Sequence, residues 1–429
     1  MPPVVGVDFG TSNSVVALAS EDGPPRLAHF PLLGRQTSSF RSLLFFDLDE
    51  QVPGRAPVYA AGPEGIEAYL EALGEGRLIQ SFKTHLTNEH LGRTSIGPHA
   101  LDLDGLVTTF LVRLRERAEA SLGQPVRAAV FGRPVSFVGA KDPEGNARAE
   151  ARLRRAAEAA GFDELAIELE PIAAAYHYEA SLDHDELALI ADFGAGTTDF
   201  CVMRIGPSRR DQRADQRAGD VLAVGGVAVA GDNFDAALID HIVAPRLGKG
   251  STYSEFGKRL PIPPSYYYKL SRWHQLSFLR TRQTRNALER LLQHADEPEA
   301  IEALMLIIED NQGFHLHKSV EATKVALSSE EHALFRYEHE EFEIVESVSR
   351  AEFEAWTARE VEAIAAGLDA TLSGAGLGPG DIDRVFMTGG TAFVPAVRRA
   401  FTDRFGGAKL SSGDELSSIA AGLAARGRR

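Results

Sequence analysis

A stretch near the start of the sequence combines a carboxylate, a glycine and hydroxyl side chains between two apolar runs. It reads VVGVDFGTSNSVVAL over residues 4–18. Asp8 ends the first run, and the turn before the second run is Gly10, Thr11, Ser12 and Asn13. A glycine between two strands lets backbone N–H groups face one point, and such a concave row of donors suits a phosphate. The stretch therefore predicts a hairpin that binds an anion.

The same design returns near the middle of the chain. The stretch ALIADFGAGTTDFCVM, residues 188–203, places Asp192 before a turn made of Gly194, Ala195, Gly196 and Thr197. The repetition predicts two equivalent halves that each offer a carboxylate and a hydroxyl-lined hairpin to a shared cleft. One nucleotide phosphate tail between the two hairpins is the simplest ligand for that arrangement. Ala195 fits the middle of the second turn only if its φ is negative.

The two aspartates predict a cation beside the phosphates. A strand-end carboxylate next to a phosphate hairpin repels the ligand unless a cation lies between them. Hydrated Mg²⁺, which keeps its waters and binds through one or two carboxylates, therefore suits Asp8 and Asp192. A single Asp-Phe-Gly is a common strand-end turn, but two copies followed by hydroxyls favour the metal site. A protein kinase also binds Mg²⁺ through Asp-Phe-Gly, but the chain has no GxGxxG loop, no His-Arg-Asp and no Walker GxxxxGK[ST] sequence.

A third glycine signal lies late in the chain. MTGGTAFVP, residues 387–395, follows a predicted strand and precedes a predicted helix, and it contains Gly389, Gly390 and Thr391. Here the chain can pass close to a flat or anionic ligand. Gly389 and Gly390 are equally compatible with an ordinary tight turn.

Composition excludes some function classes. Sixty-one acidic and forty-five basic residues give a net charge of −16, which argues against general attraction to nucleic acid or to an anionic membrane surface. The single cysteine, Cys201, lies in an apolar strand pattern, so we expect a small buried side chain and no disulfide within the chain. Without a basic leader or an apolar run of roughly 18 to 20 residues, the sequence predicts a soluble, cytoplasmic protein.

Apolar periodicity between the hairpins predicts alternating helices and strands. Spacings of three and four residues predict a helix over 101–122, and the run 126–131 predicts a buried strand. Pro143 begins another helix, which Gly161 ends as a C-cap. A strand over 165–169 and a helix over 172–181 complete the alternation, which is typical of α/β proteins.

The rest of the chain predicts more varied structure. Residues 47–100 are rich in Gly and Pro and predict an irregular, appended subdomain that has a short helix near 65–73 and carries Lys83. The charged segment 207–219 predicts a solvated loop. The later predicted elements are a strand over 221–229, a helix from Gly231, a mostly helical region over 250–330, strands within 335–348, a long helix over 351–373, a strand over 384–387, a helix from 394 and a last helix from Asp414.

Taken together, these motifs resemble the ATPase domain of the seventy-kilodalton heat-shock proteins, the DnaK superfamily. VGVDFGTSNSVVAL is similar to their first phosphate motif, ADFGAGTTDF to their second, and FMTGGTAFVPAVR to their adenosine motif. LEPIAAAYHY resembles the segment that joins their lobes, and VAGDNFDAALI and VEATKVALS resemble the regions that flank their nucleotide cleft. The matches follow the family's order from residue 4 to residue 425.

The resemblance implies an α/β, actin-like ATPase fold with two lobes that close on ATP, each with a mixed five-stranded sheet and helices. Lobe I would span 1–185 with an inserted subdomain at about 40–100, and helix 411–429 would return to it. Lobe II would span 186–410 with an inserted, mostly helical subdomain at about 231–349.

Position by position, the resemblance also implies roles for the site residues. Asp8 and Asp192 would hold the waters of Mg²⁺, and Thr11, Ser12 and Thr197 would contact phosphates. Lys83 would steady the γ-phosphate, and Glu170 and Asp199 would orient or polarise the attacking water, so that Thr197 and these three residues form the catalytic set. Phosphoryl transfer depends mostly on positioning and charge stabilisation, and these assigned roles are of those two kinds. The remaining implied nucleotide contacts are Gly10, Asn13, Gly194, Ala195, Gly196, Gly231, Glu321, Lys324, Ser328, Gly389, Gly390, Thr391 and Asp414.

Two departures from the family change the expected properties. Val325 and Phe393 stand where the family commonly places arginines against adenine, so we expect a base held by apolar contact or selected less strictly. The predicted last helix finishes at Arg429, with no interlobe linker and no β-rich peptide-binding domain after it. In this respect the sequence is similar to the short, YegD-type chaperone-like proteins.

The leading functional hypothesis is an ATP-binding, slowly hydrolysing switch whose nucleotide state is read by another protein. An actin-like scaffold is one alternative, because actin-like folds also polymerise. A small-molecule kinase is another, because sugar and acetate kinases share the fold and Asp199 could supply the carboxylate they need.

Overall fold

The structure is a computed structural model that describes residues 3–20, 23–72, 75–210, 212, 217, 219–272, 275–276, 279–310, 312–339, 341–412 and 417–427. Contacts divide the chain into two compact units. The first comprises Met1–Ala72, Gly76–Gly231 and Val361–Arg429, and the second comprises Leu73–Glu75 and Asp232–Glu360. The expected lobes over 1–185 and 186–410 stay a prediction.

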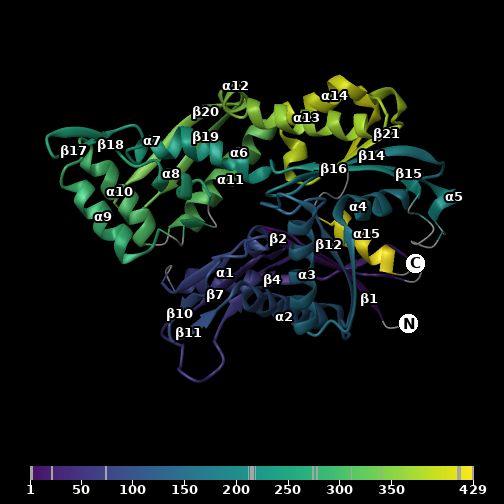
Figure 1. Ribbon diagram of the computed structural model, residues 1–429, viewed down its shortest axis with the longest axis horizontal. Coiled ribbons are helices and arrows are strands. Elements are labelled where there is room, and N and C mark those ends of the chain that lie inside the picture. The colour runs from purple at the N-terminus through teal and green to yellow at the C-terminus, as the bar shows by residue number, and fades with distance from the viewer. Residues whose placement is uncertain are drawn as a thin grey trace. The chain divides into compact units, whose positions relative to one another are not determined.

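Two mixed sheets of the first unit share one strand order (Figure 1). The first runs β13-β12-β1-β2-β3, with β6 also on β2, and the second runs β22-β21-β14-β15-β16. In each sheet the central strand, β1 or β14, pairs in parallel with one neighbour and antiparallel with the other. The repeated hairpin thus belongs to a repeated sheet, and the α/β prediction is confirmed. The strands are β1 Val4–Phe9, β2 Asn13–Leu18, β3 Arg26–Leu27, β6 Phe40–Arg41, β12 Ala128–Arg133, β13 Glu164–Leu169, β14 Glu186–Phe193, β15 Thr198–Ile205, β16 Val221–Val227, β21 Arg384–Thr388 and β22 Leu410–Ser412.

Helices cover both faces of these sheets, which explains the nearly continuous apolar strands. Side chains of β1 alternate: Val5, Val7 and Phe9 join the core formed with α2 and α3. On the second sheet, the ring of Phe401 in α14 contacts those of Phe193 and Phe200. The helices of the first unit are α1 Gly62–Glu71, α2 Leu103–Leu122, α3 Pro143–Ala159, α4 Glu170–Glu179, α5 Pro207–Arg210, α14 Pro395–Phe405, α15 Ser418–Gly427 and most of α13 Ala358–Gly374.

Two helices, α4 and α15, form a layer between the sheets (Figure 1). Helix α15 packs on β1, β2 and β12, and α4 packs on β14 and β15 as well as on α15. Glycines allow this close approach: a Cβ at Gly6 would lie 2.1 Å from the carbonyl oxygen of Ala420, and one at Gly422 would lie 1.7 Å from that of Ala173. Backbone packing therefore joins the last helix to the first strand and to α4.

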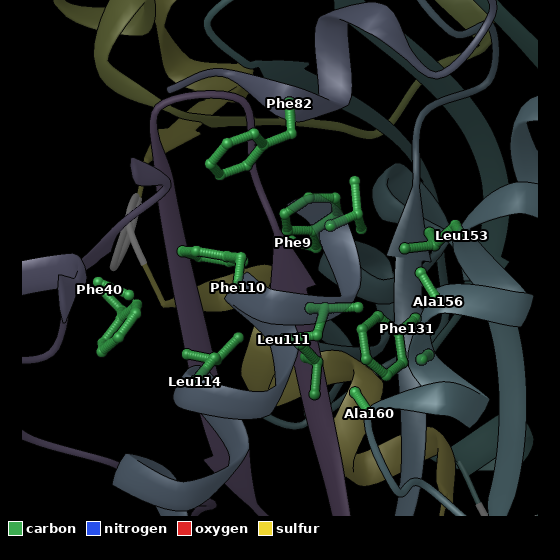
Figure 2. Close-up of a cluster of buried hydrophobic side chains, with 14 of the residues drawn as sticks. Phe9, Phe40, Phe82, Phe110, Leu111, Leu114, Phe131, Leu153, Ala156 and Ala160 are labelled. Carbon is green, nitrogen blue, oxygen red and sulfur yellow. The ribbon is translucent and has the colours of Figure 1, made fainter. Parts of the chain in front are cut away.

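The aromatic core beneath the first hairpin is centred on Phe110 of α2. Its ring centroid lies 5.7 Å from that of Phe9, 5.6 Å from that of Phe40 and 5.5 Å from that of Phe82. Figure 2 shows these rings grouped around Phe110. Phe9 follows Asp8 and Phe82 precedes Lys83, so one apolar contact set anchors both chain segments.

Short elements interrupt the irregular structure predicted for residues 47–100, and short strands also precede it. The predicted short helix is α1, and the 3-10 turn η1, Phe82–His85, carries Lys83. The strands around them pair with one another and not with the main sheets. They are β4 Phe30–Leu32 with β5 Arg35–Thr37, β7 Leu43–Phe46 with β8 Ala60–Ala61 and β9 Arg77–Gln80, and β10 Thr94–Ile96 with β11 His99–Leu101.

The prediction of a solvated loop over 207–219 is wrong at Arg217. This side chain is 1% exposed and donates two hydrogen bonds to the Glu179 carboxylate, at 2.7 and 2.8 Å, and one to Asp220 at 3.1 Å. Its guanidinium also lies over the ring of Tyr176. The buried cation is stable there because charged partners at the end of α4 and the start of β16 surround it.

The second unit is mostly helical, as predicted, with two hairpins. The hairpin β17–β18 was not predicted, and the predicted helix over 351–373 is interrupted at Thr357, whose ψ of 11° leaves the helical region. The elements are α6 Gly231–Leu238, the π-helix Ile239–Val243, α7 Ala244–Arg246, β17 Thr252–Glu255, β18 Lys258–Pro261, α8 Ser265–Leu270, α9 Arg282–Leu292, α10 Pro298–Glu309, α11 Gly313–Ser329, β19 His332–Glu338, β20 Glu343–Ser349 and α12 Arg350–Trp356.

Gly422→Ala is expected to lower the free energy of unfolding by about 2 kcal/mol or more, because the new methyl group meets the Ala173 carbonyl and forces α15 away from α4. Urea denaturation measures the change. Gly374→Ala is the matched control, since that glycine ends α13 with open space around its Cβ position. Equal stability of the two variants would contradict the proposed backbone packing.

Candidate functional site

The two predicted metal carboxylates lie at the same end of equivalent central strands. Asp8 on β1 is paired with Val15 of β2, and Asp192 on β14 is paired with Asp199 of β15. They are close enough for the charge of Asp8 to raise the pKa of Asp192, after the larger effects of burial, Glu170 and Asp199. The structure therefore brings both hairpins to one place in the first unit.

Lys83 and Glu170 form a buried ion pair at this place. The Nζ of Lys83 lies 2.5 Å from Oε1 of Glu170, and both side chains are buried. Lys83 comes from η1, and Glu170 is the first residue of α4. Gly132 of β12 leaves room for the carboxylate, because a Cβ there would lie 3.0 Å from Cγ of Glu170. Lys83 thus belongs to the same cluster as the aspartates.

Negative charge exceeds positive charge in this cluster, hereafter the carboxylate cluster: Asp8, Glu170, Asp192 and Asp199 with the single cation Lys83. Removal from water, together with Glu170, raises the pKa of Asp8 to about 7 and that of Asp199 to about 7. Burial alone would lower the pKa of Lys83, but Glu170 and Asp8 outweigh it and raise that pKa. Lys83 therefore stays charged while the aspartates compete for protons.

Asp199 is held by two hydrogen bonds. The N–H of Val135 donates to Oδ1 at 2.9 Å, and the Thr197 hydroxyl donates to Oδ2 at 2.9 Å. A Cβ at Gly226 would lie 2.6 Å from Oδ1, so only glycine fits beside this carboxylate on β16. These contacts fix the direction of the Asp199 carboxylate and of the Thr197 hydroxyl.

In the first hairpin turn a close backbone contact requires glycine at position 10, whereas a backbone hydrogen bond closes the second turn. A Cβ at Gly10 would lie 2.0 Å from the carbonyl oxygen of Asn13, and the N–H of Gly194 donates to the carbonyl of Thr197 at 2.9 Å. Ala195 is absent from the described non-glycine residues of positive φ, so its predicted negative φ is confirmed. The side chains after each glycine lie at the ends of the paired strands. Within this set, Ser12 and Gly196 are only partly buried, whereas Thr11 is buried.

The side chain of Asn13 has protein partners. Its Oδ1 accepts hydrogen bonds from the Ser39 hydroxyl at 2.8 Å and from the Arg41 guanidinium at 3.3 Å. Asn13 therefore joins β2 to the neighbouring β6 segment as well as lying in the first turn.

The third glycine loop lies against the second hairpin. Gly389 has a φ of +87°, and a Cβ there would lie 2.0 Å from the carbonyl oxygen of Phe193. Gly390 and Thr391 begin the 3-10 turn that follows. The N–H of Gly231 donates to the carbonyl of Gly194 at 3.4 Å, and a Cβ on Gly231 would lie 3.5 Å from the Thr391 hydroxyl. Of the residues predicted around the nucleotide, these four are thus brought together, while Asp414 lies outside the described residues.

The three predicted ribose and adenine residues lie on α11 of the second unit. Lys324 Nζ lies 2.7 Å from Oδ1 of Asp235 on α6, and the hydroxyl of Ser328 donates to the Lys324 carbonyl at 3.1 Å. Burial by itself lowers the pKa of Lys324, but Asp235, with smaller contributions from Glu321 and Asp232, raises it. The sequence reasoning missed Asp235, although it stands in the quoted VAGDNFDAALI. The position of these residues with respect to the carboxylate cluster stays a prediction.

The two apolar residues expected near the adenine are exposed. Val325 on α11 is 62% exposed, and Phe393 after the third glycine loop is 47% exposed. Large apolar side chains that stay in water are available for contact with a ligand.

The chain matches the model of a known protein family. The model of the family described as Hsp70 protein matches residues 85–250 and 295–428, which is well over half of the chain. The chain belongs to the Hsp70 family. Membership establishes the actin-like ATPase fold, and it supports a nucleotide-binding, chaperone-like ATPase. The matched residues include Glu170, the second hairpin, α11 and the third glycine loop, and the first hairpin precedes them. None of the helices within the described ranges has the length and apolar character needed to cross a membrane.

The carboxylate cluster fits the Mg²⁺ that Hsp70 ATPases use with their nucleotide. Magnesium prefers oxygen ligands and keeps several waters. Four carboxylates around one lysine leave an excess of negative charge that a divalent cation would balance. In the described part of the chain, no group of three or more His, Cys, Asp or Glu side chains is placed to hold a metal directly.

Lys83→Met is expected to reduce the free energy of unfolding by about 3 kcal/mol or more, because it leaves Glu170 buried without its cation. The double variant Lys83→Met/Glu170→Gln removes both charges. Its free energy of unfolding should therefore fall less than that of the single variant. Denaturant unfolding of both, without nucleotide, tests the pair. A double variant as unstable as Lys83→Met would show that the buried carboxylate carries no such cost.

Asp199→Asn is expected to stabilise the nucleotide-free protein at pH 8 in EDTA, which removes metal ions. The pKa of Asp199 rises on folding from 3.8 to about 7. The native state therefore holds a proton that the unfolded chain has lost, so wild-type stability falls as pH rises through this window. Asparagine can keep both hydrogen bonds without the charge. Thermal unfolding at several pH values should show that the stability gained by the variant over wild type grows from pH 5 to pH 8. A gain independent of pH would contradict the raised pKa of Asp199.

Proposed function

We propose that this Hsp70-family protein binds Mg-ATP at the carboxylate cluster and hydrolyses it slowly, as a switch read by another protein. The observation that carries the proposal is the meeting of two equivalent hairpins around Lys83 and four carboxylates. Such a pair of hairpins offers turn N–H groups and hydroxyls to phosphates from two strand ends, beside carboxylates suited to a metal.

In this proposal the hairpins bind the phosphates. Thr11 and Ser12 contact phosphate oxygens, together with backbone N–H groups of Gly10, Asn13, Ala195, Gly196 and Thr197. The Gly194 N–H and the Thr197 hydroxyl already donate to the Thr197 carbonyl and to Asp199. Asp8 and Asp192 hold Mg²⁺ through its waters, and the ion supplies charge neutralisation of the phosphates. Lys83, which stays protonated, steadies the terminal phosphate from its place beside Glu170.

Asp199 and Glu170 orient the attacking water. The pKa of about 7 lets Asp199 accept a proton near neutral pH, where a general base is most effective. The bonds from Val135 and Thr197 hold the Asp199 carboxylate in one orientation. Lys83 holds the Glu170 carboxylate in the same way.

The nucleoside part of the ligand has its own predicted residues. In the family pattern Glu321, Lys324 and Ser328 line the ribose and adenine. Gly231, Gly389, Gly390 and Thr391 are further expected contacts, as is Asp414, which lies outside the described residues. The exposed side chains of Val325 and Phe393 replace cations by apolar surface, which favours contact with the base without charge.

One observation favours a second candidate, a small-molecule kinase of the same fold. Asp199 is a buried carboxylate whose pKa lies near neutrality, and such a group can take a proton from a substrate hydroxyl as well as from water.

Titration calorimetry with ATP, with and without Mg²⁺, tests the proposal. We expect Mg-dependent binding by the wild-type protein. Asp199→Asn should keep binding while hydrolysis falls about 100-fold or more, and because this variant is expected to be more stable, unfolding would not explain the loss. Asp369→Asn, which breaks a surface pair with Arg404, is the matched control and should hydrolyse normally.

Absence of Mg-dependent ATP binding by the wild-type protein would refute the proposed function. Phosphate appearing on a metabolite from a screening panel, in place of inorganic phosphate, would favour the kinase.

A further inference from the structure

Ser42 is a buried residue that no motif singled out, and it contacts both segments that approach the proposed phosphates. It lies between β6 and β7, and its side chain is 2% exposed. Its N–H donates to the carbonyl of Ser12 at 3.0 Å, and its hydroxyl donates to the carbonyl of Gly10 at 2.7 Å. Its own carbonyl accepts a hydrogen bond from the N–H of Ser81 at 3.0 Å.

The direction of the hydroxyl proton is settled by its neighbours. The Oγ atoms of Ser42 and Ser14 lie 3.0 Å apart. A hydroxyl has one proton, and that of Ser42 is given to the Gly10 carbonyl, so Ser14 is the donor between the two hydroxyls. Ser14 is equally buried but has no hydrogen bond to the turn of the first hairpin.

The bond to Gly10 fixes the donor that follows it. The carbonyl of Gly10 and the N–H of Thr11 belong to one rigid, planar peptide group and point to opposite sides of the chain. Holding the carbonyl on the Ser42 side therefore turns the Thr11 N–H away from Ser42. Within the described residues, that N–H makes no hydrogen bond.

In the second hairpin, a different donor holds the carbonyl of the corresponding glycine. Gly194 occupies the position of Gly10 after Asp-Phe, and its carbonyl accepts a hydrogen bond from the N–H of Gly231 at 3.4 Å. The peptide group that ends in the N–H of Ala195 is thereby fixed in the corresponding way. In both hairpins, a donor from outside the hairpin holds the carbonyl of the first turn glycine.

Ser42 also supports the turn that carries Lys83. Its carbonyl binds Ser81, a buried residue with φ of +57°, which a serine adopts only at a cost in conformational energy. The carbonyl of Ser81 in turn accepts from the N–H of Thr84 at 3.1 Å across Lys83. One residue thus joins the first hairpin to η1.

We propose that Ser42 is a positioning residue for phosphate binding, whose hydroxyl aims the Thr11 N–H at the ligand. This inference rests on the proposed binding of ATP at the carboxylate cluster. Ser42 itself touches no ligand, so its effect belongs to the phosphates and not to the nucleoside.

Ser42→Ala and the matched control Ser14→Ala test the inference, because both remove one buried hydroxyl but only the first frees the Gly10 carbonyl. Calorimetry with Mg-ATP and with adenosine, and thermal unfolding of each variant, are the measurements. We expect Ser42→Ala to weaken Mg-ATP binding about tenfold, with adenosine binding and the Ser14→Ala variant within about twofold of wild type. Ser42→Thr, which keeps the hydroxyl, should recover most of the lost affinity.

Equal losses of Mg-ATP affinity in Ser42→Ala and Ser14→Ala would overturn the inference, as would a parallel loss for adenosine. These outcomes are distinct from a failure of the proposed function, in which the wild-type protein itself would not bind Mg-ATP.

Discussion

The excess of buried negative charge is the constraint on which the site depends. Four carboxylates share one lysine, and burial, followed by the charge of Glu170, raises the pKa values of Asp8, Asp192 and Asp199. Charges in such an arrangement are costly until a cation or protons balance them. A positively charged ligand at the cluster would therefore lower this cost.

Apolar and backbone packing supply the energy that offsets this cost. Phe110 contacts rings adjacent in sequence to Asp8 and Lys83, so burial of aromatic surface holds those charged residues in place. On the other side of β1, the glycines at positions 6 and 422 let α15 pack at backbone distance. The functional groups thus stand on rigid elements whose own stability comes from elsewhere in the unit.

Much of the fold and of the site could be predicted because the signals were local. Asp-Phe-Gly after an apolar run marked both hairpins, and Gly161, with a φ of +91°, ends the helix it was predicted to end. The features that the sequence did not predict depend on contacts between residues that are distant in sequence. Arg217 stands in a charged segment that is typical of a loop, and only its contact with Glu179 in the folded chain makes burial possible. No sequence pattern predicted a role for Ser42, because that role depends on Gly10 and Ser81, which approach it only after folding.

The place of α15 has a consequence for the synthesis of the protein. This helix covers a face of the first sheet, although nearly the whole chain separates it from β1. On the ribosome, that apolar face stays open to other molecules until α15 emerges, a delay on the order of tens of seconds at about 5–20 residues per second. Contacts of such long sequence separation also slow folding. A member of a chaperone family would therefore itself need shielding from aggregation while it is being made.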